Sequence, residues 1–378
     1  MNQHVSRASA HTYKHAVKPL LFKQKPDGVH RRMLQTSGFV QKLPPIRSLL
    51  RASWAYDNPA YLSQIILGIT FKNPIGLSAG FDKNFEVVPL IQSIGFGYME
   101  GGSITFRSCP GNTKPWFYRL PNTKSLVVHV GLANQGAERI LQRIASYPDK
   151  LRQDFPLNIS VAKTNAPETS TDHSGIEDYV ESLKLVKKSG LGKLITINIS
   201  CPNTFGGEPF TTPRRLEKLL GAIDALKLKQ PVFVKMPCLP WARIKPLLEV
   251  TTRHNVQGVT LTNLAKDRSK IELKDPLPAD VLGGLSGKPT WETSNELIRQ
   301  TYLNYGDRFV IIGVGGVFSP EDAYTKIKLG ASMVELITGM IFEGPQLIGE
   351  INRGLVELLK HDGFTNICQA IGIDAKEK

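Results

Sequence analysis

Eight short apolar runs, each followed by a longer amphipathic segment, constrain the fold of this chain more than any other feature. They occupy residues 74–80, 97–105, 157–163, 194–200, 231–237, 258–263, 308–316 and 333–339. Near-continuous apolar strands that alternate with helices are typical of a parallel sheet covered on both faces. Eight of them predict closure into a (β/α)8 TIM barrel. A doubly wound open sheet is the less favoured alternative, because no GxGxxG pattern follows the first run.

The remaining residues predict a helical extension in front of the barrel. A barrel takes about 250 residues, and this chain has 378. We predict an extension over residues 1–56 and a barrel domain over residues 57–378. Helices in the extension are expected at residues 12–23, 28–41 and 46–56, separated by Pro26–Gly28 and Pro44–Pro45.

Two connections are unusually long for a barrel. Residues 106–130 are rich in turn formers and have alternating apolar residues near both ends, so we expect a small hairpin over the barrel mouth. Residues 264–292 form the second long connection. Loops of this length are usually lids or binding loops.

The charge of the chain is concentrated in its first segment. Residues 1–55 contain ten Lys or Arg and one acidic residue, which is +9 of the net +14. Such a segment suggests an anionic partner, either lipid head groups or nucleic acid. A basic amphipathic helical hairpin can lie in a membrane interface. A helical plug against the barrel bottom is an equal alternative.

Several other classes of protein are disfavoured. The four cysteines lack CxxC or metal-like spacing, so neither a disulfide framework nor a metal site is expected, and a reducing cytosol is the simpler compartment. No run of eighteen apolar residues predicts a spanning helix. The polar residues 1–18 do not resemble a signal peptide, whereas a transit peptide stays open.

Active sites of barrels lie at the carboxyl ends of the strands, so the residues there are the candidates for chemistry. Gly80 after the first strand allows close approach of a planar ligand, and Lys83 could place a cation over the mouth. The alternative is a capping turn with a surface lysine. The second strand ends at Gly101, Gly102 and Ser103, where a ligand could lie on the backbone.

Amide and lysine side chains follow in otherwise apolar strands. Asn158 and Asn198 would be costly there unless they are hydrogen-bonded, and amides suit the edge of a pyrimidine or an isoalloxazine ring. A structural hydrogen bond between strands is the alternative for either one alone. Lys235 ends the fifth strand and needs an anionic partner, such as a ligand oxygen.

Cys201 lies between Asn198 and Asn203 in the turn after the fourth strand. A lone cysteine is more often a small buried apolar residue, as we expect for Cys238 and Cys368. A thiol can exchange a proton near neutral pH if a cation lies close. The flanking amides favour Cys201 as a catalytic acid/base.

Glycine-rich turns end the last two strands. Gly313–Gly316 and Thr338–Gly339 follow strands seven and eight, where barrels usually hold a phosphate group. The candidate site lacks paired carboxylates and a Ser/His/Asp order. It therefore suits a phosphorylated redox cofactor and a small polar heterocycle.

These motifs together resemble the dihydroorotate dehydrogenase family. The motifs are NPIGLSAGFDKN, GFGYMEGGSIT, GNTKPWFYRLP, NISCPNT, GGLSGKP, IIGVGGV and GMIFEGP, and the resemblance covers about residues 10–355. The N-terminal helices and the RLP segment resemble the membrane-associated, quinone-reducing class. The resemblance implies oxidation of dihydroorotate with FMN and a quinone, and a location at the cytoplasmic side of the cell membrane, or at the mitochondrial inner membrane in a eukaryote. It implies no nucleic-acid partner.

The resemblance also implies roles for individual residues. FMN contacts are expected at Ala79, Gly80, Ser103, Asn158, Asn198, Lys235, Thr262, Gly287, Gly316 and Thr338. Substrate contacts are expected at Lys83, Asn198, Asn203 and Asn263. Cys201 would be the base that removes the C5 proton of dihydroorotate while a hydride leaves C6 for the flavin.

Three residues depart from the family pattern. Cys201 stands where the quinone-dependent class usually has Ser, and Cys is typical of the soluble class. Val128 stands where the family has an orotate-binding Asn, unless Asn134 nearby supplies that amide. Leu264 replaces the hydroxyl residue after Asn263. Each lost hydrogen bond to the ligand would cost about 1–3 kcal/mol.

These departures keep alternative functions open. A flavin enzyme of the same scaffold could act on another dihydropyrimidine. Dihydrouridine synthases are flavin barrels with an Asn-x-x-Cys-Pro motif, but they carry a helical RNA-binding domain after the barrel, and only 39 residues follow position 339 here. A catalytically silent flavoprotein at a membrane is disfavoured by the presence of Lys83, Cys201, Asn203 and Lys235 together.

Overall fold

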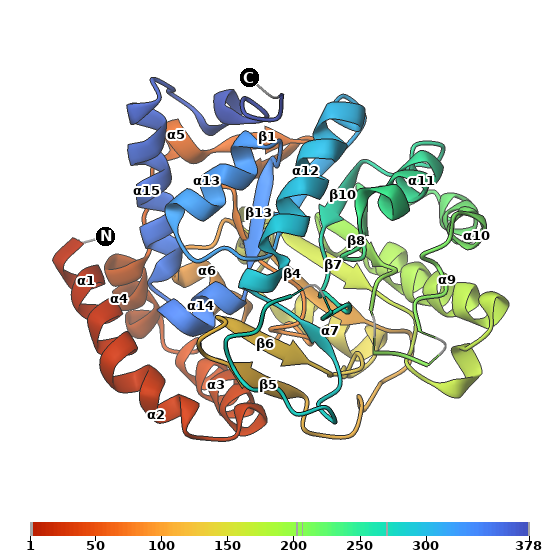
Figure 1. Ribbon diagram of the computed structural model, residues 1–378, viewed down its shortest axis with the longest axis horizontal. Helices are drawn as coiled ribbons and strands as arrows, with labels where there is room; N and C mark the ends of the chain where they lie inside the picture. The colour runs from red at the N-terminus through yellow and green to blue at the C-terminus, as the bar shows by residue number, and fades with distance from the viewer. Residues whose placement is uncertain (1–2, 202, 206, 270, 377–378) are drawn as a thin grey trace.

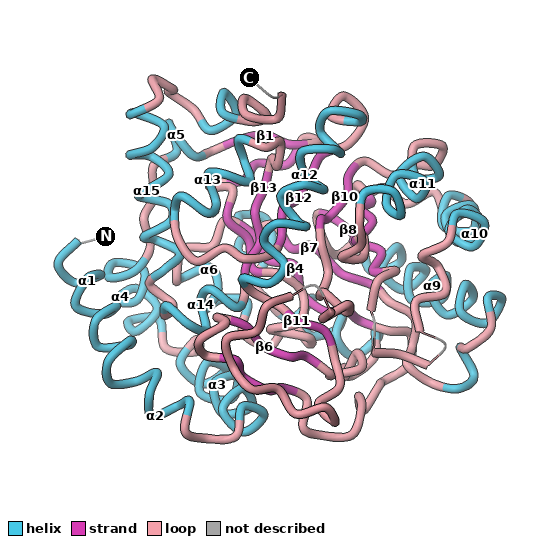
Figure 2. The backbone as a smooth tube through the Cα atoms, viewed as in Figure 1, coloured by secondary structure: helices cyan, strands magenta, loops and turns pink. Residues whose placement is uncertain are grey.

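A computed structural model describes residues 3–201, 203–205, 207–269 and 271–376. Its centre is a closed barrel of eight parallel strands, which confirms the predicted fold (Figure 1, Figure 2). Each predicted run contains one strand. The strands are β3 (Ile75–Leu77), β4 (Tyr98–Ile104), β7 (Leu157–Val161), β8 (Leu194–Asn198), β9 (Val232–Lys235), β10 (Gly258–Leu261), β12 (Val310–Val314) and β13 (Met333–Leu336). They neighbour one another in chain order, and β13 pairs with β3 to close the barrel.

Helices cover the outside of the barrel. They are α6 (Val88–Ser93), α7 (Ala137–Ser146), α8 (Asp149–Asp154), α9 (Asp172–Ser189), α10 (Pro213–Asp224), α11 (Trp241–Thr251), α12 (Trp291–Tyr305), α13 (Pro320–Lys328), α14 (Thr338–Glu343) and α15 (Leu347–His361). Each of the longer helices buries one apolar stripe. On α7 the buried residues are Ala137, Ile140, Leu141 and Ile144, which is the spacing of one helix face.

The barrel bottom is closed by a hairpin of β1 (Gln64–Ile66) and β2 (Ile69–Phe71). Phe71 packs edge-to-face on Tyr98, with ring centroids 5.4 Å apart. Tyr98, Phe233 and Met333 are buried together in this apolar layer. Because side chains on a strand alternate, the residues two positions further along β4, β9 and β13 also point into the barrel, one layer nearer its mouth.

The predicted hairpin lies over the mouth as β5 (Phe117–Leu120) and β6 (Ser125–Val128). The second long connection adds β11 (Gly284–Leu285), which pairs with β6 in an antiparallel register. The two long connections therefore form one three-stranded sheet, which the sequence did not predict.

The N-terminal helices lie against one side of the barrel mouth, beside α14 and α15 (Figure 1). They are α1 (Gln3–Thr12), the π-turn η1 (Tyr13–Val17), α2 (Lys18–Phe22), α3 (Pro26–Val40) and α4 (Pro44–Trp54), followed by α5 (Pro59–Leu62). The prediction that the first helix begins at residue 12 was wrong, because no proline or glycine interrupts the chain before Pro19. The prolines Pro26 and Pro44 stand at the first position of helices, where a missing N–H costs nothing.

Polar contacts of η1 attach these helices to α14, at the barrel mouth. The Tyr13 hydroxyl donates to the carbonyl of Ile341 at 2.7 Å, and Lys14 pairs with Glu343 at 2.5 Å. The alternative of a plug under the barrel is thus wrong. Within the described part of the chain, no helix combines the length and apolar character needed to cross a membrane. The domain boundary at residue 56 stays a prediction.

Candidate active site

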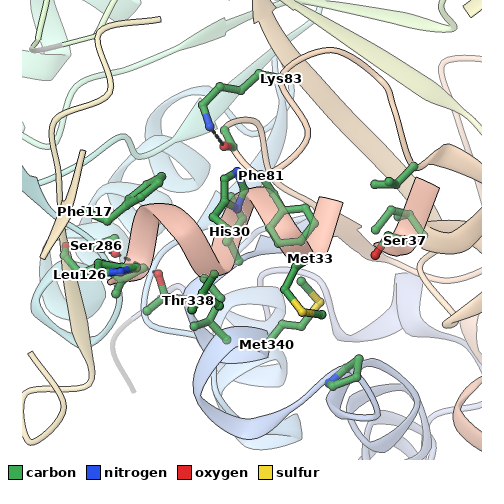
Figure 3. Close-up of a pocket in the computed structure, with 18 of the residues that line it drawn as sticks. His30, Met33, Ser37, Phe81, Lys83, Phe117, Leu126, Ser286, Thr338 and Met340 are labelled. Carbon is green, nitrogen blue, oxygen red and sulfur yellow. Dashed lines mark hydrogen bonds between the residues drawn. The ribbon is translucent and has the colours of Figure 1, made fainter. Parts of the chain in front are cut away.

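A cavity of about 990 Å³ extends from the N-terminal helices to the carboxyl ends of the strands (Figure 3). Its volume is at the upper end of the range for ligand sites, roughly 300–1,000 Å³. Helix α3 forms one wall, with His30 and Met33 facing the cavity. Its lining also includes Cys201 and Lys235. One continuous cavity therefore reaches both the barrel mouth and the helical extension.

Ten of the residues predicted for the site line this cavity. They are Ala79, Gly80, Lys83, Ser103, Asn198, Cys201, Asn203, Lys235, Asn263 and Thr338. Four predicted FMN contacts are absent from its described lining, namely Asn158, Thr262, Gly287 and Gly316. Their roles stay predictions.

The loop after β3 is shaped by Asp82. Its buried carboxylate accepts hydrogen bonds from the N–H groups of Asn84, Glu86 and Val87 at 3.3, 2.8 and 2.8 Å. Burial raises the pKa of Asp82 to about 6, although these N–H groups oppose the shift. The resulting turn presents Lys83, whose Nζ donates to the carbonyl of Gly80 at 2.7 Å. Burial lowers the pKa of Lys83 to about 8.

Three amides at the mouth are oriented by hydrogen bonds to the protein. Asn198 Nδ2 donates to Ser103 Oγ at 2.8 Å. Asn203 Nδ2 donates to the carbonyl of Val128 at 2.9 Å. Asn263 Nδ2 donates to the carbonyl of Ser200 at 2.8 Å. The amides are thus fixed before any ligand arrives, which reduces the entropy lost on binding.

Asn158 differs from these three amides. It is fully buried and exchanges hydrogen bonds with the hydroxyl of Thr196, at 2.9 and 3.1 Å. This is the hydrogen bond between strands that the sequence left open as an alternative. Asn158 therefore supports the barrel below the cavity.

The Cys201 thiol lines the cavity, and the residue is partly exposed. Burial raises the pKa of Cys201 to about 11, and the charges of Lys163 and Lys266 only partly oppose this shift. The cations expected near the thiol are present, but desolvation outweighs them. Cys201 therefore carries its proton at neutral pH.

Glycines and small hydroxyl residues form the wall near β13. An added Cβ on Gly80, at φ +111°, would meet no atom closer than 4.0 Å, so a side chain there would fill ligand space. Thr338 Oγ1 donates to Ser286 Oγ at 2.9 Å, and both residues line the cavity. Gly287 and Gly316 are not part of the described lining; both have φ +75°, which favours glycine, and both pack closely on neighbouring chain segments. This wall suits a bulky ligand with a phosphate group.

The aromatic wall was missed by the sequence analysis. His30 packs edge-to-face against Phe81 and Phe117, with ring centroids 5.5 Å apart in both pairs. Burial lowers the pKa of His30 to about 3, assisted by the charge of Lys83, so its ring is neutral. His30 and Met33 stand three residues apart on one helix face, and this spacing was the available signal (Figure 3).

Arg119 joins the hairpin to the helices. Its guanidinium donates to the carbonyls of Phe22 and Gln24, at 3.2 and 2.6 Å, and lies 4.6 Å from the centre of the Phe22 ring. The turn between α2 and α3 is therefore held against β5.

Both apolar departures from the family pattern face the cavity. Val128 and Leu264 belong to its lining, whereas Asn134 does not. The Asn134 amide is buried and bonded to Thr105 Oγ1 at 2.7 Å. Asn134 therefore does not supply the amide that Val128 lacks.

Comparisons with known proteins agree with this geometry. The model of the family described as dihydroorotate dehydrogenase matches residues 61–359. The chain belongs to this family. A protein of Nostoc punctiforme named dihydroorotate dehydrogenase (quinone) is 32% identical over 379 residues, covering 97% of this chain and 99% of the relative. One of the same name from Rippkaea orientalis is 34% identical over 368 residues, covering 94% and 96%.

Solved structures of the dihydroorotate dehydrogenase family show the same architecture. The crystal structure of DHODH from Eimeria tenella in complex with ferulenol has a TM-score of 0.83 and 26% identity, and covers 95% of this chain and 99% of that one. The ligand-free form from the same organism has a TM-score of 0.82, with 93% and 99% covered. Family membership, which the sequence motifs implied, is thus confirmed.

Proposed function

We propose that this protein oxidises dihydroorotate to orotate with FMN as cofactor and a quinone as electron acceptor. The observation that carries the proposal is the single cavity that joins Cys201 and the oriented amides to the apolar N-terminal helices. Relatives of nearly equal length bear the name dihydroorotate dehydrogenase (quinone), which supports both substrates.

The cavity wall fits a flavin nucleotide. Gly80 leaves space for a planar ring, Lys235 offers a cation, and Thr338 and Ser286 offer hydroxyls for a phosphate. FMN, when bound, would supply the acceptor for a hydride.

The protein side chains would supply binding and proton transfer. Lys83 would pair with the carboxylate of dihydroorotate, and Asn198, Asn203 and Asn263 would orient its ring. Cys201 Sγ would accept the C5 proton as the hydride leaves C6. Because the thiol is protonated at neutral pH, it must first lose its own proton, and Lys163 and Lys266 favour that loss.

We propose that the helices also contact a membrane at its surface. Leu20 of α2, Phe39 of α3 and Leu49 of α4 are 62%, 66% and 64% exposed. Basic residues accompany them along the same helices. An interfacial helix needs this combination of apolar and basic side chains to bind anionic lipid. A membrane-dissolved quinone would then reach the cavity from the lipid side.

Anaerobic mixing of the purified protein with dihydroorotate tests the proposal. The protein should be yellow, and dihydroorotate should bleach the flavin absorbance. Added quinone should then restore it. A protein that binds FMN but is not bleached by dihydroorotate would contradict the proposed substrate.

A second candidate is oxidation of a dihydropyrimidine other than dihydroorotate. Val128 and Leu264 favour it, because they put apolar surface where a polar ring edge would seek partners. Bleaching by dihydrouracil in the same experiment, without bleaching by dihydroorotate, would select this candidate.

A further inference from the structure

Two glutamates lie inside the barrel in the layer between its apolar bottom and the cavity. Glu100 and Glu335 are both fully buried. Each stands two residues after a member of the bottom layer, Tyr98 on β4 and Met333 on β13, so both point into the barrel. This position removes them from solvent and places them below the cavity.

Lys235 connects the two glutamates to the cavity. It stands two residues after Phe233 of the bottom layer, and it also lines the cavity. Its Nζ lies 3.6 Å from Glu100 Oε1 and donates to Ser78 Oγ at 3.3 Å. The anionic partner that a buried lysine requires is therefore a carboxylate of the protein itself.

The charges of this group do not balance if both glutamates are ionised. Two carboxylates and one ammonium would leave a net negative charge in the barrel interior, which is strongly unfavourable. A proton on one carboxyl leaves a neutral group of one anion, one cation and one acid. Burial and the charge of Glu100 raise the pKa of Glu335 well above its ordinary value, so Glu335 is the acid.

The hydrogen-bond donors support the same conclusion. All four carboxyl oxygens of Glu100 and Glu335 are buried without a hydrogen-bond donor among the described residues. Two ionised carboxylates accept hydrogen bonds and cannot donate to one another, whereas a protonated carboxyl donates one. The Tyr98 hydroxyl is also buried beside Glu335, and burial, together with the nearby carboxylates of Glu335 and Glu100, raises its pKa well above the ordinary value. Tyr98 is thus a neutral neighbour.

We propose that Glu335 holds a proton beside Glu100 and that Glu100 is the counter-charge of Lys235, so that this buried pair sets how readily a flavin bound over Lys235 would accept electrons. The inference rests on the proposed function, since it takes a flavin bound over Lys235. A hydride carries two electrons and one proton, so its acceptor gains one negative charge. Lys235 stabilises that charge, and Glu100 weakens this effect. Both glutamates are positioning residues that act through the lysine.

The test is a potentiometric titration of the bound flavin with an artificial reductant, which needs neither dihydroorotate nor quinone. Glu335→Gln replaces a neutral acid by a neutral amide, so the ratio of reduced to oxidised flavin at fixed potential should change less than about threefold. Glu100→Gln/Glu335→Gln leaves Lys235 without a counter-charge. In this double variant the ratio of reduced to oxidised flavin at fixed potential should rise at least tenfold, which for a two-electron couple is about 30 mV. Glu217→Gln, at a half-exposed position of α10 outside the barrel, is the control and should leave this ratio unchanged.

Infrared spectra provide a second measurement that does not depend on flavin. The wild-type protein should show the C=O band of a buried protonated carboxyl at neutral pH, and Glu335→Gln should remove it. Glu100→Gln should also remove it, because Glu335 then ionises to pair with Lys235. A tenfold shift from Glu335→Gln alone, or no such band in the wild type, would overturn the proposal. If the purified protein contains no flavin, the proposed function is contradicted. The infrared band would still show whether a buried carboxyl is protonated.

Discussion

The barrel mouth and the N-terminal helices differ in how many of their side chains are already paired or packed within the protein. At the mouth, the amides of Asn198, Asn203 and Asn263 are oriented by hydrogen bonds to the protein. On the helices, large apolar residues such as Leu20 and Leu49 are exposed. The mouth is organised for a small polar ligand, and the helices are organised for an apolar surface. Mutations at the mouth should therefore impair flavin reduction alone, and mutations on the helices should impair membrane binding alone.

The largest effect is expected at the mouth, from Cys201→Ala. Without a base at C5, flavin reduction by dihydroorotate should slow by about 10²–10⁴-fold. Reoxidation of chemically reduced flavin by quinone should be unchanged, because this step takes place at the helical end. Anaerobic stopped-flow absorbance measures both steps. Cys368→Ala is the control, because the Cys368 thiol is exposed; the expectation from the sequence that it is buried was wrong. Equal slowing of both steps would contradict a separation between the two ends.

The next largest effect is expected at the helices. Leu20→Glu/Leu49→Glu places two charges on the proposed membrane surface and should weaken binding to anionic vesicles at least about tenfold, since each buried leucine contributes about 1.5–3 kcal/mol. Flavin reduction by dihydroorotate should be unaffected. Ile65→Glu is the matched control, because Ile65 is 75% exposed on the hairpin at the barrel bottom. Sedimentation with vesicles distinguishes the variants. Equal loss of vesicle binding in Ile65→Glu would contradict the proposal that the N-terminal helices contact the membrane.

A smaller effect should come from restoring a polar contact at the mouth. If dihydroorotate is the substrate, Val128→Asn adds an amide to the wall of the cavity and should tighten binding by about tenfold, the value of one net hydrogen bond. Val128→Ala is the control, because it changes the same side chain without adding an amide. Weaker binding of dihydroorotate to Val128→Asn would favour the second candidate substrate. Equilibrium titration of the flavin absorbance measures both variants.

The sequence predicted the barrel because its signal is local. Each strand is a short apolar run, and each run contains one observed strand. The amides and Cys201 were found because polar residues at strand ends must meet at the mouth. The pairing of β11 with β6 was not predicted, because it joins connections more than 150 residues apart by a two-residue strand without a pattern of its own.

The partners of the buried charged residues could not be predicted from the sequence. Lys235 was noticed as a buried lysine, and its partner was expected to be a ligand. Glu100 and Glu335 also lie in apolar runs, at residues 97–105 and 333–339, and nothing in the sequence marks them as partners of the lysine. The structure pairs Glu100 with Lys235. The stagger between the strands of a closed barrel decides which side chains meet inside it. The hydrophobic pattern of a single strand does not contain that information. The pKa of Cys201 was likewise misjudged, because burial depth decides it and not the presence of lysines.

The smallest predicted effect concerns pH and separates binding from proton transfer within the mouth itself. The pKa of Lys83 is lowered to about 8, so its positive charge is present below that pH and is lost as the pH rises through it. Binding of the dihydroorotate carboxylate should therefore weaken about fourfold between pH 7 and pH 8.5, following the charged fraction of the lysine. The rate of flavin reduction at saturation should rise over the same range, because the pKa of Cys201 is raised to about 11 and more thiolate forms. Lys83→Arg should keep its charge and remove the pH dependence of binding while leaving that of the rate, since a guanidinium stays protonated throughout. A wild-type dissociation constant that is flat across this range would show that Lys83 does not carry the carboxylate, and the mouth would then have to bind its ligand through the amides alone.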